Sequence, residues 1–187
     1  REYVSALEHQ AEKLRFLIDA LVKTSRLESG VLAMTPKRHG IQQLLDAASA
    51  QAAPGAEAKA ITLTVEPTDL TARFDPKWTA EALYNLVDNA VKYTPAGGAV
   101  TLRAVGYELF CRVDVTDTGP GIPESEQARI FQRFYRSPSA SEAEGVGIGL
   151  YLARQIAAGQ GGYLKVSSRP GEGSTFSLFL PRAEERT

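Results

Sequence analysis

The amino-acid sequence predicts an α+β fold in which a mixed sheet is covered by helices on one face and preceded by one long helix. Residues 1–29 contain neither glycine nor proline, and their apolar residues recur at steps of three and four. From residue 35 onward, helical periodicity and strand-like alternation are interleaved. Two pairs of expected strands are adjacent in sequence as hairpins, which favours helices on one face of a partly antiparallel sheet.

The opening helix carries an apolar stripe with heptad spacing. The stripe consists of Val4, Leu7, Ala11, Leu14, Ile18, Leu21 and Ser25. Gly30 is a natural C-terminal stop, so we assign residues 1–30 to a separate helical region. A lone helix of this kind cannot bury its stripe. We therefore expect partner helices, most simply from a second chain, and the alternative is a helix packed on its own domain.

The other expected elements lie between residues 35 and 182, which we assign to a second domain. Pro54 and Gly55 are expected to break the first helix of this domain, whereas Asp75 and Pro76 provide a cap and a first turn for the next. We expect helices over residues 41–53, 76–93, 123–133 and 149–159. We expect strands over residues 61–65, 70–74, 100–105, 109–115, 163–167 and 175–180.

Composition excludes several classes of protein. The chain has 187 residues, with 21 Lys and Arg against 22 Asp and Glu, for a net charge of -1. A sequence-independent nucleic-acid binder would need a basic excess, so we expect no nucleic-acid partner. The single cysteine, Cys111, excludes an intrachain disulfide framework and suits a reducing, cytoplasmic compartment. The longest apolar runs are far shorter than the roughly 20 residues that span a bilayer.

A polar stripe on the helix over residues 76–93 is the first candidate for chemistry. Asn85 and Asn89 are four residues apart, so their amides share a face, and Lys92 follows one turn later. Amide oxygens and a cation on one stripe suit a polyphosphate with bound Mg²⁺, which takes hard oxygen ligands. The alternative is an ordinary solvated polar face.

A glycine-rich turn over residues 117–123 is the second candidate. Asp117 at a strand end can accept a hydrogen bond from an exocyclic amine, and Gly119 and Gly121 let a flat ring approach the backbone. The alternative is a tight turn that needs glycine and proline for its geometry alone.

Two further stretches follow along the chain. Residues 130–136 combine aromatic side chains with Arg133 and Arg136, which can reach phosphate oxygens. The small polar residues after them are typical of a lid over a site. Gly145, Gly147 and Gly149 then open a helix, where exposed backbone N–H groups and the helix dipole favour an anion.

Together, these four stretches resemble the N, G1, F and G2 boxes of the ATP-binding domain of sensor histidine kinases, a superfamily that includes gyrase-type ATPases and heat-shock-90 chaperones. Residues 173–176, followed by Leu180 and Pro181, are similar to the closing strand pair of the family. The resemblance covers residues 35–182. It implies a Bergerat-type two-layer α/β sandwich, with ATP and Mg²⁺ as ligands.

The resemblance also implies a role for each matching residue. Asn85, Asn89 and Lys92 would serve catalysis, with Asn89 as the Mg²⁺ ligand. The nucleotide contacts would be Asn89, Lys92, Tyr93, Asp117, Gly119, Gly121, Ile122, Arg133, Arg136, Gly145, Gly147, Gly149, Leu150 and Thr175. Hydrolysing relatives carry a glutamate at the position of Asn85, and asparagine cannot accept a proton, which favours transfer to a histidine over hydrolysis.

The opening helix is similar to the second helix of the family's dimerisation and phosphoacceptor hairpin. The first helix, which would carry the acceptor histidine, is absent, and neither His9 nor His39 has the expected neighbours. We therefore expect a fragment that binds ATP without phosphorylating itself, in a parent protein that dimerises and relays phosphate to a response regulator. Membrane anchoring of the parent is a family expectation. The alternatives are a degenerate nucleotide-binding or dimerisation module and a serine kinase of the anti-sigma type.

Overall fold

The computed structural model describes residues 2–30, 33–138 and 147–182, and the chain divides into two compact units, residues 1–33 and 34–187. The first unit is one 27-residue helix, α1 (Glu2–Glu28), followed by Gly30 at a φ of 66°. The expected apolar stripe is exposed along α1, as at Leu7 and Leu14. The long helix is thus confirmed, whereas its partner helices remain a prediction.

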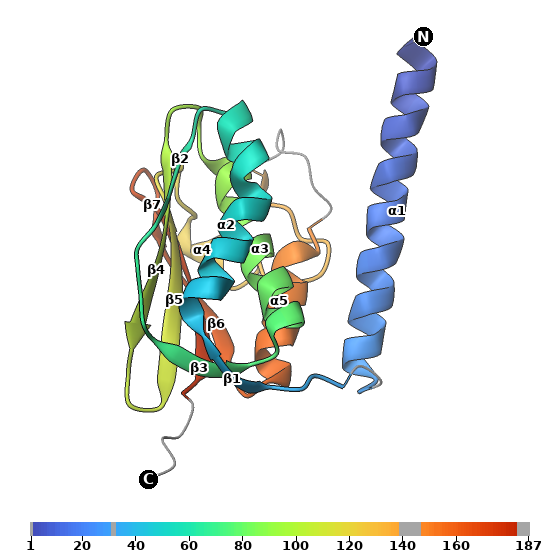
Figure 1. Cartoon of the computed structure of the whole chain (residues 1–187). Helices are drawn as coiled ribbons and strands as arrows, with labels where there is room; N and C mark the ends of the chain where they lie inside the picture. The colour runs from blue at the N-terminus through green and yellow to red at the C-terminus, as the bar shows by residue number, and fades with distance from the viewer. Residues whose placement is uncertain (1, 31–32, 139–146, 183–187) are drawn as a thin grey trace. The chain divides into compact units, whose positions relative to one another are not determined.

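The second unit is built on a five-stranded mixed sheet with the order β2-β4-β5-β7-β6. Its strands are β2 (Thr62–Val65), β4 (Ala99–Gly106), β5 (Phe110–Asp117), β6 (Tyr163–Arg169) and β7 (Gly173–Pro181). Strand β2 pairs with β4 in parallel, and all other pairs in this sheet are antiparallel. The helices α2 (Ile41–Ala58), α3 (Pro76–Tyr93) and α5 (Gly149–Gly159) cover one face (Figure 1). The expected fold class is confirmed.

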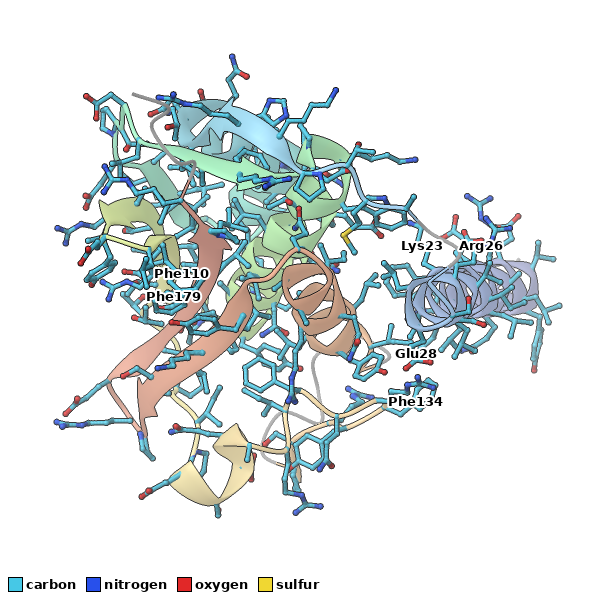
Figure 2. All side chains as sticks on the ribbon, turned by 90° about the horizontal axis from the view of Figure 1, so that it is seen from below. Lys23, Arg26, Glu28, Phe110, Phe134 and Phe179 are labelled. Carbon is cyan, nitrogen blue, oxygen red and sulfur yellow. The ribbon has the colours of Figure 1, made fainter. Side chains whose placement is uncertain are left out.

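The helix-free face of the sheet carries an aromatic cluster. Phe110 and Phe179 lie on the neighbouring strands β5 and β7 (Figure 2), and Tyr163 stacks on Phe179 with ring centroids 4.3 Å apart. The residues next to Phe110 and Phe179 along their strands point the other way, toward the helices. Among them, Cys111 on β5 is 1% exposed. Burial raises the pKa of the Cys111 thiol to about 11, although the nearby charge of Arg182 acts in the opposite direction.

Three elements differ from the sequence-based expectation. Helix α2 continues through Pro54 to Ala58, because Ala52 and Ala56 keep the buried face in helical period beyond the proline. A short strand that the sequence does not signal, β1 (Lys37–Gly40), pairs antiparallel with β3 (Thr71–Phe74). Helix α4 (Glu124–Gln127) is shorter than expected, and the turns after it bury Ile130 and Phe131.

Helix α3 begins as expected, with Asp75 as its cap. The Asp75 carboxylate accepts from the backbone N–H groups of Lys77 and Trp78 at 3.1 and 3.2 Å. Its second oxygen accepts from the backbone N–H of Thr35 at 2.9 Å. Burial raises the pKa of Asp75, but the hydrogen bonds from Thr35 and from the first turn of α3 outweigh it, so the pKa lies below its ordinary value.

Replacing Asp75 with alanine is expected to lower the free energy of unfolding by about 0.5–2 kcal/mol at neutral pH, because the cap of α3 is lost. A lowered folded-state pKa means that the ionised carboxylate stabilises the fold above its unfolded pKa, and this contribution fades as pH falls through the folded pKa. Urea unfolding at pH 7 and at about pH 3 should therefore show a smaller difference from wild type at the lower pH. Asp69→Ala, at an exposed loop carboxylate, is the control and should match wild type.

Candidate nucleotide-binding site

Helix α3 carries the polar stripe, and it packs against α2, α5 and the central strand β5. Asn85 and Asn89 are half-buried, and Lys92 is exposed and forms an ion pair with Asp88 at 2.8 Å. A Cβ atom at Gly149 would lie 3.7 Å from the Asn85 amide oxygen. The first turn of α5 therefore packs directly against Asn85, and the helix start carrying Gly149 is adjacent to the polar stripe.

Asp117 lies at the C-terminal end of β5 and is 6% exposed. Its Oδ1 atom accepts from the backbone N–H of Gly119 at 2.8 Å. Burial raises the pKa of Asp117, and the backbone hydrogen bonds from Gly119 and Ser174 offset only part of this effect. Within the described part of the chain, Asp117 has no ion pair, so its burial carries a desolvation cost. Buried carboxylates with a perturbed pKa of this kind are typical of functional sites.

The turn after Asp117 packs against the end of α3. A Cβ atom at Gly119 would lie 3.3 Å from the Tyr93 carbonyl oxygen, so glycine lets the two segments meet. Gly121 has a φ of 75°, and a Cβ atom there would lie 2.0 Å from the Arg169 carbonyl oxygen. The neighbouring Ile122 donates its backbone N–H to Ser168 Oγ at 2.8 Å. These contacts place Asp117 and the end of α3 side by side.

The structure does not place Thr175 beside Asp117. Successive side chains of a strand alternate between faces, and Thr175 lies on the helix-free face, where its hydroxyl is 3.0 Å from that of Thr116. Ser174 is the residue opposite Asp117 in the β5–β7 register and is 6% exposed. Ser174, and not Thr175, therefore lies on the same face of the sheet as Asp117. The alternation of buried residues along β7 is the signal that could have identified Ser174.

The F-box and G2-box stretches are held together by backbone contacts. Phe134 has a φ of 59° and donates its backbone N–H to the Gly147 carbonyl oxygen at 2.8 Å. Gly147 itself has a φ of 77°, and a Cβ atom there would lie 2.6 Å from the Tyr135 carbonyl oxygen. Arg133 donates to the Tyr151 hydroxyl at 2.9 Å. Packing and backbone conformation therefore favour glycine at position 147.

The other residues expected to contact the nucleotide are Arg136, Leu150 and Gly145. Arg136 is exposed, and Leu150 is half-buried in the first turn of α5. The sequence-based prediction places the lid over residues 135–146, of which residues 139–146, including Gly145, lie outside the described residues.

The donor set fits a magnesium ion held jointly with phosphate. Within the described residues, no group of three or more His, Cys, Asp or Glu side chains could hold a metal by itself. Asn85 and Asn89 offer amide oxygens at a half-buried position beside the start of α5. Mg²⁺ commonly takes one or two protein oxygens and completes its shell with water and substrate phosphates.

Within the described residues, no helix combines the length and apolar composition that a bilayer crossing requires.

Comparisons with known proteins show the family to which the chain belongs. A family model described as "Histidine kinase-, DNA gyrase B-, and HSP90-like ATPase" matches residues 74–184. The chain is 34% identical over 187 residues to the circadian input-output histidine kinase CikA of Synechococcus elongatus, covering 97% of this chain and 25% of CikA. It thus spans about a quarter of the length of that relative.

Solved structures of histidine kinases share the fold. Full-length ShkA in complex with AMPPNP superposes with a TM-score of 0.83 at 29% identity, covering 98% of this chain and 40% of ShkA. ThkA in complex with the response regulator protein TrrA gives a TM-score of 0.78 at 20% identity, covering 100% of this chain and 52% of that chain. The chain therefore belongs to the family of histidine kinase-, DNA gyrase B- and HSP90-like ATPases and contains the ATP-binding catalytic domain of a sensor histidine kinase.

Proposed function

We propose that this chain transfers the γ-phosphate of Mg-ATP to a histidine on a helical hairpin, for relay to a response regulator. One observation carries the proposal. The buried Asp117 carboxylate lies beside the end of the α3 stripe that holds Asn89 and Lys92, so an adenine and its phosphates have adjacent partners. The match to ShkA, whose structure contains AMPPNP, supports the same ligand class.

Each side chain then has a defined task. Asp117 accepts a hydrogen bond from the adenine amine, and Ser174 contributes a hydroxyl beside it. Lys92 exchanges its ion pair with Asp88 for phosphate oxygens. Asn89 provides an oxygen for Mg²⁺, with Asn85 next to it. The ion, when bound, neutralises phosphate charge.

Transfer rather than hydrolysis follows from the neutral amide of Asn85. An imidazole nitrogen forms the new P–N bond while the bond from the γ-phosphorus to the bridging oxygen breaks, and ADP leaves. Asn85 cannot deprotonate a water molecule, so a competing hydrolysis lacks its general base. The residues on α3 position the phosphates, and the acceptor supplies the nucleophile.

Neither histidine of this chain is proposed as the acceptor. His9 is exposed on α1 and has no acidic residue directly after it. His39 lies on β1 with its ring 5.4 Å from that of Phe74. We propose instead that the acceptor lies on the first helix of a hairpin whose second helix α1 resembles, and that α1 belongs to a homodimer through its exposed apolar stripe. The ThkA–TrrA complex supports a response regulator as the downstream partner.

Phosphorylation in trans tests this function. The chain incubated with γ-labelled ATP alone should remain unlabelled, because it lacks an acceptor in line with the γ-phosphate. Addition of a cognate hairpin should give a slow appearance of acid-labile, base-stable label on the hairpin. Asn89→Ala is the matched inactive control.

Two results would contradict the proposal in different ways. Label on His9 or His39 in the isolated chain would overturn the assignment of both residues. An unlabelled hairpin despite intact ATP binding would favour the alternative, a non-catalytic or degenerate nucleotide-binding module.

A further inference from the structure

Lys59 is the C-cap residue directly after α2, and its ammonium group is bound to the end of α3. Its Nζ atom donates to the carbonyl oxygens of Val91, Lys92 and Thr94 at 2.7, 2.8 and 2.7 Å. An ammonium has three protons, so this one helix end takes all of its donors. We propose that Lys59 is a positioning residue that fixes the end of α3 from which Lys92 and Tyr93 project, an inference that rests on the proposed function of that site.

Charge gives the first reason for a lysine at this position. The last carbonyl groups of a helix have no intrahelical donor and carry a partial negative charge. An anionic polyphosphate beside Lys92 would be repelled by that charge. The ammonium of Lys59 lies directly on these carbonyl groups and cancels the repulsion.

Backbone contacts give the second reason. The Lys59 carbonyl oxygen accepts from the N–H of Gly97 in the loop after α3, at 3.3 Å. The carbonyl group of Tyr93, between two of the carbonyl groups that Lys59 holds, is the one against which Gly119 packs. A shift at this helix end would therefore move the turn whose Gly119 N–H donates to the Asp117 carboxylate. Lys59 thus links the expected phosphate side of the site to the adenine side.

The backbone at Lys59 does not depend on its side chain. The turn that ends α2 is closed by hydrogen bonds from the N–H groups of Lys59 and Ile61 to the Ala56 carbonyl oxygen, at 3.2 and 2.9 Å. Ala60 in the same turn has a φ of 53°. Substitutions of the Lys59 side chain should therefore leave the turn and the fold in place, so that ATP binding can be measured in each variant.

Calorimetry with Mg-ATP on three variants tests the proposal. Lys59→Met keeps the length of the side chain and removes the charge, and should weaken ATP binding about fivefold to tenfold. Lys59→Arg keeps a donor group and should remain within about threefold of wild type. Asp75→Ala removes the cap at the opposite end of α3 and should bind ATP as wild type does. Wild-type affinity in Lys59→Met, or an equal loss in Asp75→Ala, would overturn the proposal.

Amide NMR spectra of the nucleotide-free protein give an independent measurement. Lys59→Met should shift the amide signals of Tyr93, Gly97 and Gly119, whereas Asp75→Ala should leave these three unchanged. If the wild-type chain binds no ATP, the proposed function fails, and these spectra still decide the role of Lys59. Unchanged signals in Lys59→Met would show that the ammonium does not position the site.

Discussion

Asp117→Asn is expected to weaken Mg-ATP binding by roughly tenfold to a hundredfold. The asparagine keeps the size of the side chain but presents N–H groups where the adenine amine needs an acceptor. The carboxylate is 6% exposed, and loss of a charge-assisted hydrogen bond in such a site costs on the order of 1.5–3 kcal/mol. Isothermal titration calorimetry measures the change directly.

Asp114→Asn is a matched control on the same strand. Asp114 is also buried, at 8% exposure, but it lies on the helix-free face, where it pairs with Arg112 at 2.9 Å and accepts from Ser177 at 2.6 Å. Its substitution should leave ATP affinity unchanged. If Asp117→Asn binds ATP as tightly as wild type, Asp117 is not the adenine contact.

The raised pKa of Asp117 adds a pH dependence to this prediction. Burial raises the pKa of Asp117 and so favours its protonated form. The ionised carboxylate is the better acceptor for the adenine amine, because neither of its oxygens carries a proton. As the pH is lowered, ATP affinity should therefore begin to fall at a higher pH than it would if Asp117 had the pKa of an ordinary aspartate. Asp117→Asn lacks this titration, so its remaining pH dependence reports on ATP and other groups.

Gly173→Ala is expected to lower the free energy of unfolding strongly. Gly173 has a φ of 84°, and a Cβ atom would lie 2.0 Å from the Asp117 carbonyl oxygen. Backbone strain at positive φ costs about 1–3 kcal/mol and overpacking a similar amount. We expect a loss of about 2–5 kcal/mol in the free energy of unfolding, together with weaker ATP binding, because the end of β5 that carries Asp117 must move.

Gly171→Ala separates these two costs. Gly171 lies in the same turn with a φ of 82°, but nothing lies within 4 Å of the position of its Cβ atom. This variant should lose only the strain contribution and should bind ATP normally. Equal denaturant midpoints for Gly171→Ala and Gly173→Ala would contradict the claim that contact with Asp117 is what excludes a side chain at residue 173.

Local signals explain which elements the sequence predicted well. Helix α3 begins and ends where expected, because the cap of Asp75 and the first-turn Pro76 mark its start. The proline signal failed at Pro54, since burial of the alanines around it outweighs the lost hydrogen bond. Strand β1 was missed because its sequence, Lys-Arg-His-Gly, has no apolar alternation and depends on pairing with β3.

The candidate site divides in the same way. The motifs predicted Asp117 and the stripe around Asn89 as site residues, since both depend on residue type and short spacing. Finding that Ser174 rather than Thr175 shares a face with Asp117 required the register of β7, because one residue along a strand changes the face. Lys59 could not be found from spacing, because the carbonyl groups it binds lie 32 to 35 residues along the chain.

The buried thiol of Cys111 can serve as a native probe of local opening around β5. With a pKa of about 11 and 1% exposure, it is almost entirely un-ionised and shielded at neutral pH. Alkylating reagents can then modify it only when the helix layer that covers it, or strand β5 itself, moves away from the thiol. The labelling rate thus follows the local opening equilibrium between the sheet and its helices on the strand that ends at Asp117, without any introduced probe.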